Sequence, residues 1–150
     1  MTMATHLAKC LGRKQCRYEI LHRAGAGTQT PTIPHDRLAR TILLEDQRGY
    51  LIAVFPASHH LRLAELRDQT GRALTRVHGD GVREVFRDCH PGALPPAGYG
   101  VQTWLDDSLL AHADVYFEAG DRDEVVHMRT GQFGELMAEA RHGHFSHRLM

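Results

Sequence analysis

The segment Asp88–Gly100, with the sequence DCHPGALPPAGYG, has the residue pattern best suited to chemistry. Its three Gly and three Pro make it too kinked for a helix or a strand, because Gly permits positive φ and Pro fixes φ. Such a rigid loop presents backbone N–H groups at fixed positions. Groups of this kind stabilise the negative charge that develops on a carbonyl oxygen during ester hydrolysis. An ordinary surface turn rich in Gly and Pro is the alternative interpretation.

The sequence does not predict a protein nucleophile. It contains no GxSxG, CxxC, HExxH or GxxxxGK[ST] motif, so the common signatures of hydrolases, zinc centres and phosphate-binding loops are missing. Cys89 and His90 are neighbours, but adjacent side chains on an extended loop point apart. A covalent nucleophile needs a base within hydrogen-bond reach. We therefore expect Cys89 to be a small buried apolar group.

Twelve histidines are many for a chain of this length, and two groups of them could in principle bind a metal. His142, His144 and His147 lie in HGHFSH near the end, and His59 and His60 precede a predicted helix. A mobile terminus does not offer the fixed ligands and ordered surroundings of a metal site. The sequence therefore predicts solvated or capping histidines, with no metal and no cofactor.

The composition favours one globular domain. The chain has 150 residues, 42% of them hydrophobic and 24% charged, and its net charge is zero. This balance is unlike that of a protein that binds nucleic acid through a global basic field, although it permits a local patch. No apolar run of about 18 residues predicts a membrane span, and the three cysteines fit a reduced cytoplasmic setting. Basic residues gather near both ends, where a solvated surface is the simpler interpretation: Lys9, Arg13, Lys14, Arg17, Arg23, Arg141 and Arg148.

Several short elements must position the loop. Hydrophobic periodicity predicts strands at Arg17–His22, Leu38–Leu44, Tyr50–Phe55, Ala73–Val77, Val101–Leu105, Val115–Glu118 and Glu124–Met128. Helices are predicted at residues 2–13, Leu61–Gln69, Gly81–Phe86, Leu109–Ala111 and Gln132–Ala140.

Turn and capping residues connect these elements. Glu45–Gly49 predicts a hairpin turn, Gly71 predicts a helix end, and either Asp107 or Ser108 could cap the helix that follows. Ala24–Pro34 is rich in Gly, Thr and Pro and is expected to be a loop. Strands that alternate with short helices, together with one tight hairpin, predict an α+β domain with a mixed, curved sheet packed by helices.

Three segments together resemble the YbaK/prolyl-tRNA-synthetase-associated editing domain family. They are the loop, ARTILLEDQRGYLIAVFPASHHLRLAELR at Ala39–Arg67, and DVYFEAGDRDEVVHM at Asp114–Met128. The resemblance covers about Tyr18–Phe145 and implies a single editing domain at 1–150 with a barrel-like sheet. Members of this family hydrolyse wrongly charged aminoacyl-tRNA, so the resemblance implies the aminoacylated 3′ end of tRNA as partner. It leaves open whether a synthetase is a second partner.

The resemblance also assigns site residues. Arg40 stands where the family usually has a functional Lys near the ester and the terminal nucleotide. The GxxxP pattern at Gly92–Pro96 implies that Gly92 and Ala93 form the oxyanion site. Substrate-binding residues follow from the same loop and from a second pocket turn: Leu94, Pro95, Pro96, Gly98, Gly120, Asp121 and Arg122. In this family water attacks the ester, and the terminal ribose hydroxyl of the tRNA positions or activates it.

Departures from the family pattern keep two functions open. Arg40 keeps the charge of Lys but is bulkier and cannot act as a base, and Arg122 replaces a usual His. Ala24–Pro34 is shorter than the helix that the family has there, and the loop after Pro96 is tighter. The first hypothesis is a free-standing trans-editing deacylase. The second is a catalytically degenerate module that binds an aminoacyl-tRNA or nucleotide end without hydrolysing it.

Overall fold

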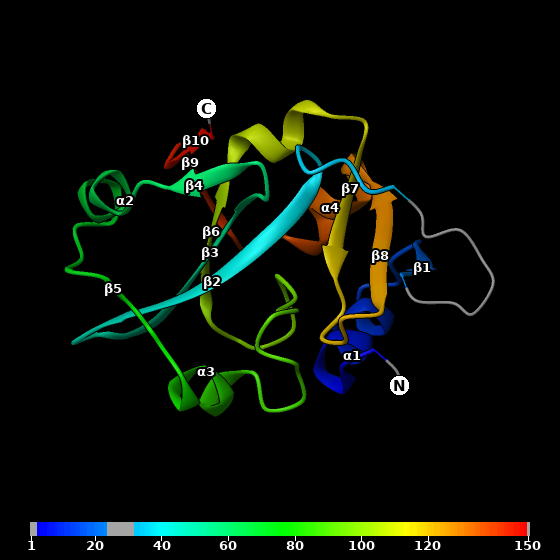
Figure 1. Cartoon of the computed structure of the whole chain (residues 1–150), viewed down its shortest axis with the longest axis horizontal. Coiled ribbons are helices and arrows are strands. Elements are labelled where there is room, and N and C mark those ends of the chain that lie inside the picture. The colour runs from blue at the N-terminus through cyan, green and yellow to red at the C-terminus, as the bar shows by residue number, and fades with distance from the viewer. Residues whose placement is uncertain (1–2, 24–31, 150) are drawn as a thin grey trace.

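Eight strands of the described residues form one mixed sheet that runs through the molecule (Figure 1). The computed structural model describes residues 3–23 and 32–149. The strands are β1 Glu19–His22, β2 Leu38–Asp46, β3 Gly49–Pro56, β4 His59–Leu61, β5 Thr75–Arg76, β6 Gln102–Asp106, β7 Asp114–Glu118, β8 Glu124–Arg129, β9 Arg141–Gly143 and β10 Ser146–Arg148. The helices are α1 Thr5–Arg13, α2 Leu63–Thr70, α3 Asp80–Val85, the 3₁₀ helix η1 Asp107–Ala111 and α4 Thr130–Leu136.

The sheet mixes parallel and antiparallel pairs and stays open. Its order is β1-β8-β7-β2-β3-β6-β9, and β5 pairs with β2 beside this path. β2 pairs in parallel with β7, and β3 pairs in parallel with β6, whereas the β2–β3 and β7–β8 pairs are antiparallel. β1 and β9 lie at opposite ends of the order without pairing, so the predicted barrel-like sheet is curved but not closed. The predicted α+β class is confirmed.

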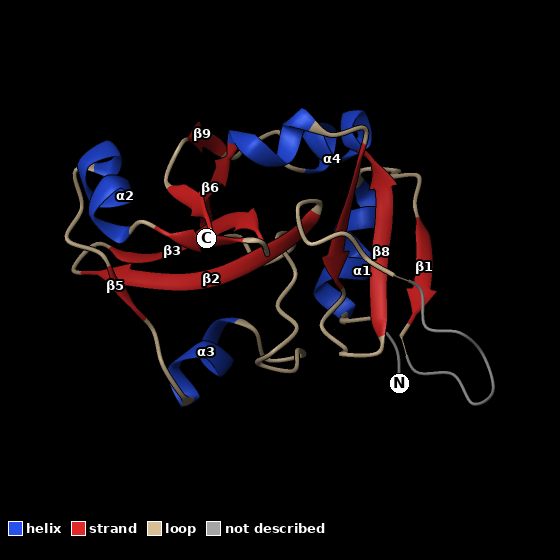
Figure 2. Cartoon of the chain, turned by 45° about the horizontal axis from the view of Figure 1, so that its top comes forward, coloured by secondary structure: helices blue, strands red, loops and turns tan. Residues whose placement is uncertain are grey.

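Two apolar clusters cover the sheet. The larger contains residues of α1, α4, β7 and β8, and α1 lies behind β7 and β8 in Figure 2. The smaller cluster joins Leu66 of α2 to Trp104 and Phe145. Because α1 repeats apolar residues at helical spacing, it buries Leu7 and Leu11 against the sheet.

Most predicted elements are present, with shifted ends. The β2–β3 hairpin is longer than predicted, since its strands extend to Asp46 and begin again at Gly49. Gly71 ends α2 at a left-handed φ of 67°, as predicted. The cap of η1 is Asp106, whose side chain accepts from the Ser108 N–H, so the prediction of Asp107 or Ser108 was wrong. The prediction for Ala24–Pro34 falls largely outside the described residues.

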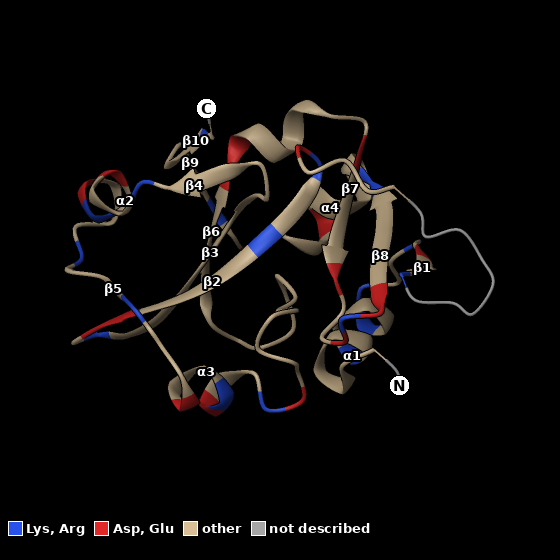
Figure 3. Cartoon of the chain, viewed as in Figure 1, with Lys and Arg blue, Asp and Glu red and all other residues tan. Residues whose placement is uncertain are grey.

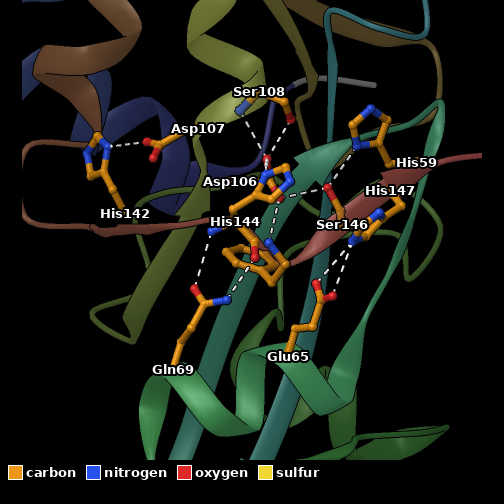
Figure 4. A network of polar contacts seen from close by, with 11 residues as sticks. His59, Glu65, Gln69, Asp106, Asp107, Ser108, His142, His144, Ser146 and His147 are labelled. Atoms are coloured by element: carbon orange, nitrogen blue, oxygen red, sulfur yellow. Dashed lines mark hydrogen bonds and ion pairs between the residues drawn. The ribbon is translucent and has the colours of Figure 1, made fainter.

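The histidine-rich end was predicted to be mobile, and this was wrong. β9 pairs with β6, and β10 pairs with β4. The buried carboxylate of Asp106 accepts hydrogen bonds from Phe145 N–H at 2.9 Å and Ser146 Oγ at 2.8 Å (Figure 4). Ser146 Oγ also lies 2.9 Å from Nδ1 of His59, and burial lowers the pKa of that histidine. This network fixes the segment to the body of the domain.

Acidic and basic residues are interspersed along the helices, strands and loops (Figure 3). Several basic residues near the two ends are paired: Lys14 with Glu139, Arg23 with Glu118 and Arg148 with Asp36. Over the described ranges 3–23 and 32–149, no helix combines the length and the apolar character needed to cross a bilayer.

Candidate active site

An interruption in strand pairing opens a cavity beside β2. The pairing of β2 with β7 stops at Ala39, and its pairing with β5 starts at Leu44. The cavity, of about 210 Å³, lies at this interruption. Its lining residues are Arg40, Thr41, Ile42, Arg76, Pro91, Gly92, Leu94 and Glu118. The structure therefore brings Arg40 and the Gly/Pro loop, which the sequence assigned to one site, to the same cavity.

Thr41 lies in the interruption with unmet polar groups. Leu38 O accepts from Ala57 N–H on the β3 side, whereas Leu43 O accepts from Val77 N–H on the opposite side. Because successive residues of a strand direct their backbone groups to alternate sides, the Thr41 N–H and C=O point away from β3. Its side-chain Oγ1 is also buried, with no hydrogen-bond partner among the described residues. The cavity thus has donors and acceptors on its strand wall.

Two arginines line the cavity from neighbouring strands. Arg40 on β2 and Arg76 on β5 are both exposed. Within the part of the chain that the structure describes, neither forms a hydrogen bond or an ion pair. Sequence analysis missed Arg76, because only the pairing of β5 with Leu44 brings it here. Two unpaired guanidinium groups at one cavity favour an anionic ligand.

Glu118 supplies the negative charge of the cavity. It lies at the end of β7, and its Oε2 accepts from Arg23 Nη1 at 3.1 Å. Arg23 matches part of this charge, so Glu118 attracts an ammonium group less strongly than a free carboxylate would. The cavity therefore combines cationic and anionic groups on different walls. Sequence analysis missed Glu118 as well, since nothing in the pattern of β7 distinguishes it from an ordinary exposed strand residue.

The base of the Gly/Pro loop is closed by a hydrogen-bond network. Tyr99 Oη donates to Asp88 Oδ1 at 2.6 Å, and the backbone N–H of His6 donates to Asp88 Oδ2 at 2.9 Å. Burial opposes ionisation of Asp88, but these hydrogen bonds and one from the His6 ring hold its pKa below the usual range. The loop is therefore fixed at both ends and to α1.

Backbone hydrogen bonds also fix the tip of the loop. Gly92 N–H donates to Nδ1 of His90 at 2.9 Å, and Ala93 N–H donates to the His90 carbonyl at 2.9 Å. The Leu94 N–H makes no hydrogen bond to any described residue. The two donors predicted for the oxyanion site are thus engaged within the loop, and the adjacent Leu94 donor is free. His90 had no predicted role at the tip.

The second pocket turn contacts the same loop. Gly120 N–H donates to the Ala93 carbonyl, and His90 N–H donates to the Gly120 carbonyl. Gly120 has a φ of 87°, and a Cβ there would lie 2.6 Å from Ala4 Cβ, so only Gly fits. Arg122 is exposed, and its Nε would lie 3.9 Å from a Cβ built on Gly92. Arg122 thus stands beside the loop tip.

Asp121 is buried, in contrast to its exposed neighbour. Its Oδ1 accepts from the Asp123 N–H at 2.9 Å, whereas its Oδ2 is buried and has no hydrogen-bond partner in residues 3–23 and 32–149. Asp121 is absent from the lining of the Arg40 cavity. The structure therefore gives Asp121 a clear role in shaping the turn.

The remaining predicted residues divide between two places. Leu94 lines the Arg40 cavity, whereas Pro96 and Gly98 line a separate cavity of about 390 Å³ beside α1 and α4. A Cβ on Gly98 would lie 2.8 Å from the His6 carbonyl oxygen, and its φ is 106°. Pro95 is buried beneath the loop. The structure thus brings Gly98 against α1 and not to the Arg40 cavity.

Cys89 is held as a thiol. Its Sγ lies 3.0 Å from Tyr99 Oη. Burial raises the pKa of Cys89 to about 12, and the negative charge of Asp88 acts in the same direction. Because the thiolate is the reactive species, this environment does not suit a nucleophile. Cys89 is only partly buried, and it makes a polar contact that the sequence did not predict.

Histidines of the C-terminal segment pair with nearby acids. His142 contacts Asp107 at 2.9 Å, and His147 contacts Glu65 at 3.1 Å (Figure 4). In the described ranges, His, Cys, Asp and Glu form no group of three that could hold a metal ion.

Solved structures share this fold. A candidate signal-transduction protein from Marinobacter aquaeolei VT8 superposes with a TM-score of 0.80 at 22% identity over 97% of this chain. This chain spans 31% of that protein. A candidate trans-editing enzyme for prolyl-tRNA synthetase superposes with a TM-score of 0.79 at 14% identity, over 96% of each chain. A scaffold protein from computational epitope grafting gives 0.81 at 15% identity, over 97% of each chain.

Sequence comparison gives the family. None of the curated proteins compared with the sequence matches it. The model of the aminoacyl-tRNA editing domain matches residues 21–136, which include β2, the Gly/Pro loop and the second pocket turn. This match covers most of the chain and agrees with the resemblance on which the site residues were assigned. The chain therefore belongs to the aminoacyl-tRNA editing domain family.

Proposed function

We propose that the protein is a free-standing trans-editing enzyme that hydrolyses the ester of a mischarged aminoacyl-tRNA in the cytoplasm. The observation that carries the proposal is the cavity at the β2 interruption, which joins Arg40 to Gly92 and Leu94. Synthetases discriminate poorly between amino acids that differ by a methylene, since that difference contributes only about 1–3 kcal/mol. A separate hydrolase that removes the wrong amino acid from the tRNA corrects the resulting errors.

Recognition of the 3′ end is assigned to the charged walls. Arg40 and Arg76 bind phosphate oxygens of the terminal nucleotides, because a guanidinium matches phosphate in bidentate geometry. Glu118 faces the α-ammonium group of the aminoacyl moiety. Arg122, beside Gly92, adds a positive charge that an α-ammonium avoids. These charges orient the ester with its carbonyl toward the loop tip.

Hydrolysis proceeds without a protein nucleophile. An arginine side chain cannot act as a base, which excludes that role for Arg40, and Cys89 is held as a thiol. Water attacks the ester carbon, and the terminal ribose hydroxyl positions it. The oxyanion accepts a hydrogen bond from the free Leu94 N–H. It accepts a second one from the Gly92 N–H, which leaves its present acceptor, the exposed ring of His90. Because an aminoacyl ester is already activated, positioning and charge stabilisation are sufficient.

A degenerate binding module is the second candidate, and one observation favours it. The Gly92 and Ala93 N–H groups are already bound within the loop. Donors that must first leave a partner stabilise an oxyanion less than free donors do. Such a module would bind an aminoacyl-tRNA end and recruit a partner protein, for example a synthetase.

Deacylation of labelled aminoacyl-tRNAs tests the proposal. The panel contains the Ala, Cys, Ser, Thr and Pro esters with a no-enzyme control. We expect one ester to be released well above background by the wild type and not by Gly92→Val, because a Cβ there would lie only 3.3 Å from His90 Nδ1 and the added side chain would distort the loop tip that carries the donors. A Gly131→Val variant of α4, where a Cβ meets no atom within 4 Å, controls for the added bulk. Background rates across the panel, with tRNA binding retained, would establish the binding module instead.

A further inference from the structure

A second polar cavity lies elsewhere on the sheet and has no role in the proposed function. Its volume is about 460 Å³, and it shares no lining residue with the Arg40 cavity. Four elements contribute to it, namely β3, α2, β6 and β9, together with the β2–β3 turn. The lining residues are Arg48, Tyr50, Gln69, Thr70, Arg72, Gln102, Trp104 and Arg141.

The floor of this cavity is rigid and electrically balanced. Arg72 is almost completely buried and forms two hydrogen bonds to the Asp46 carboxylate, at 2.9 Å and 2.6 Å. It also donates to Gln102 Oε1 at 2.9 Å and to the Gly49 carbonyl at 3.0 Å. The charge of Asp46 is therefore matched by Arg72 and is not available to the cavity.

The rim is cationic. Arg48 on the hairpin turn and Arg141 at the start of β9 are exposed. Neither guanidinium forms a hydrogen bond or an ion pair within residues 3–23 and 32–149. Glu84 accepts the hydroxyl hydrogen of Tyr50 at 2.8 Å, whereas the exposed Glu45, which lies opposite Tyr50 on β2, makes no side-chain hydrogen bond to a described residue. The rim thus holds two guanidinium groups without partners among the described residues, and of the nearby acids Asp46 and Glu84 are bound.

Trp104 lines the same cavity and carries a donor without a partner. It is 9% exposed, and its Nε1 is buried with no hydrogen-bond partner among the described residues. A Cβ on Gly143 would lie 3.2 Å from the indole ring and 2.4 Å from Gln69 Oε1, so Gly143 permits this close packing. Buried N–H groups in folded proteins nearly always have an acceptor, and an unpartnered one beside a cavity marks a place where a ligand can supply it.

We propose that this cavity binds a phosphate group, with Arg48 and Arg141 as its cationic ligands and the Trp104 indole as a further donor. Guanidinium groups bind phosphate in bidentate fashion, and an oxygen acceptor satisfies the indole N–H. The phosphate belongs either to a nucleic acid backbone or to a small phosphate-bearing molecule. The two sources share the same chemistry and differ only in size.

The single tryptophan of the chain provides a direct measurement. A ¹⁵N-labelled sample has one indole N–H signal, and that signal reports on Trp104. The probes are inorganic pyrophosphate, AMP and an RNA hairpin that ends in CCA. We expect a saturable shift of the indole signal, and an affinity about tenfold lower in Arg48→Gln and in Arg141→Gln, because a hydrogen bond to a charged group is strong.

The control and the outcomes separate the possibilities. Arg129→Gln removes another exposed arginine, on β8, and should leave the indole titration unchanged. A shift with the RNA alone assigns the phosphate to nucleic acid, and a shift with pyrophosphate or AMP assigns it to a small molecule. An indole signal that does not move with any probe overturns the proposal. So does a shift that persists in both arginine variants. Deacylation is not measured here, so these results are independent of the proposed function.

Discussion

The hydrogen bond from Tyr99 to Asp88 closes the base of the Gly/Pro loop, and Tyr99→Phe removes it while keeping the ring. Its length is 2.6 Å, and a hydrogen bond to a charged group contributes about 1.5–3 kcal/mol to stability. Because the Asp88 side chain is 21% exposed, we expect the lower value, about 1.5 kcal/mol. For a chain of this length the loss corresponds to a fall in Tm of roughly 3–6 °C.

Urea unfolding followed by far-UV circular dichroism measures this loss as a lower midpoint at an unchanged m value. Tyr18→Phe is the matched control, because Tyr18 is 40% exposed and forms no hydrogen bond with a described residue. Its effect should stay within about 0.5 kcal/mol. Equal midpoints for the wild type and Tyr99→Phe would refute the reasoning that this bond closes the loop.

The pH dependence adds a second check on the same bond. The pKa of Asp88 is lowered in the folded protein, so the stability it contributes is present above its ordinary value of about 3.8. That stability is lost as the pH falls below this value. Since Tyr99 helps to lower the pKa, the gap in stability between the wild type and Tyr99→Phe should stay constant until the pH falls through the lowered pKa of Asp88 in the folded variant, and should narrow below that point. A gap that widens as the pH falls would contradict the assignment.

Three further predictions concern other parts of the molecule. Arg40→Gln should flatten the slope of log affinity for tRNA against log salt by about 0.7–0.9, whereas Arg40→Lys should retain it; an unchanged slope in Arg40→Gln excludes a phosphate contact. Gly98→Ala should lower stability by about 1–3 kcal/mol in urea unfolding because of its φ of 106° and the 2.8 Å approach to His6 O, and Gly131→Ala in α4 should not. Arg72 hydrogen bonds lower the pKa of Asp46 to about 2, so its stabilisation holds above its ordinary value of about 3.8 and fades toward pH 2. Asp46→Asn should remove this pH-dependent part of the stability. Identical profiles of stability against pH for the wild type and Asp46→Asn would count against the Asp46–Arg72 pair.

Local sequence patterns predicted the elements whose structure is set by neighbours in the chain. The β2–β3 hairpin follows from two apolar runs around a turn, and Gly71 ends α2 because a left-handed residue is needed there. The strands β9 and β10 contain three residues each, too few for a periodic signal. They exist because Asp106 and β4 bind them from far along the sequence. The pattern of neighbouring residues in the sequence does not indicate these long-range contacts.

The candidate site shows the same division. The glycine and proline spacing predicted the loop at Gly92, and the family resemblance supplied Arg40. Neither identified Arg76, which lies here through the pairing of β5 with β2. The contact between Gly92 N–H and the His90 ring depends on a side-chain rotamer, which sequence does not specify. The assignment of catalytic and substrate-binding roles stays a prediction for the variants above to test.

The unpaired stretch of β2 has a consequence for how this site can change over time. The position of backbone N–H and C=O groups depends on the path of the chain and not on the identity of the side chains. Point substitutions therefore leave these groups in place. Replacement of Arg40 by Lys, or of Arg122 by His, therefore changes the side chains around the Arg40 cavity, while the backbone groups of Thr41 stay in place. Under the proposed function, sequence divergence in this domain would change which aminoacyl ends are accepted before it removed the cavity beside β2.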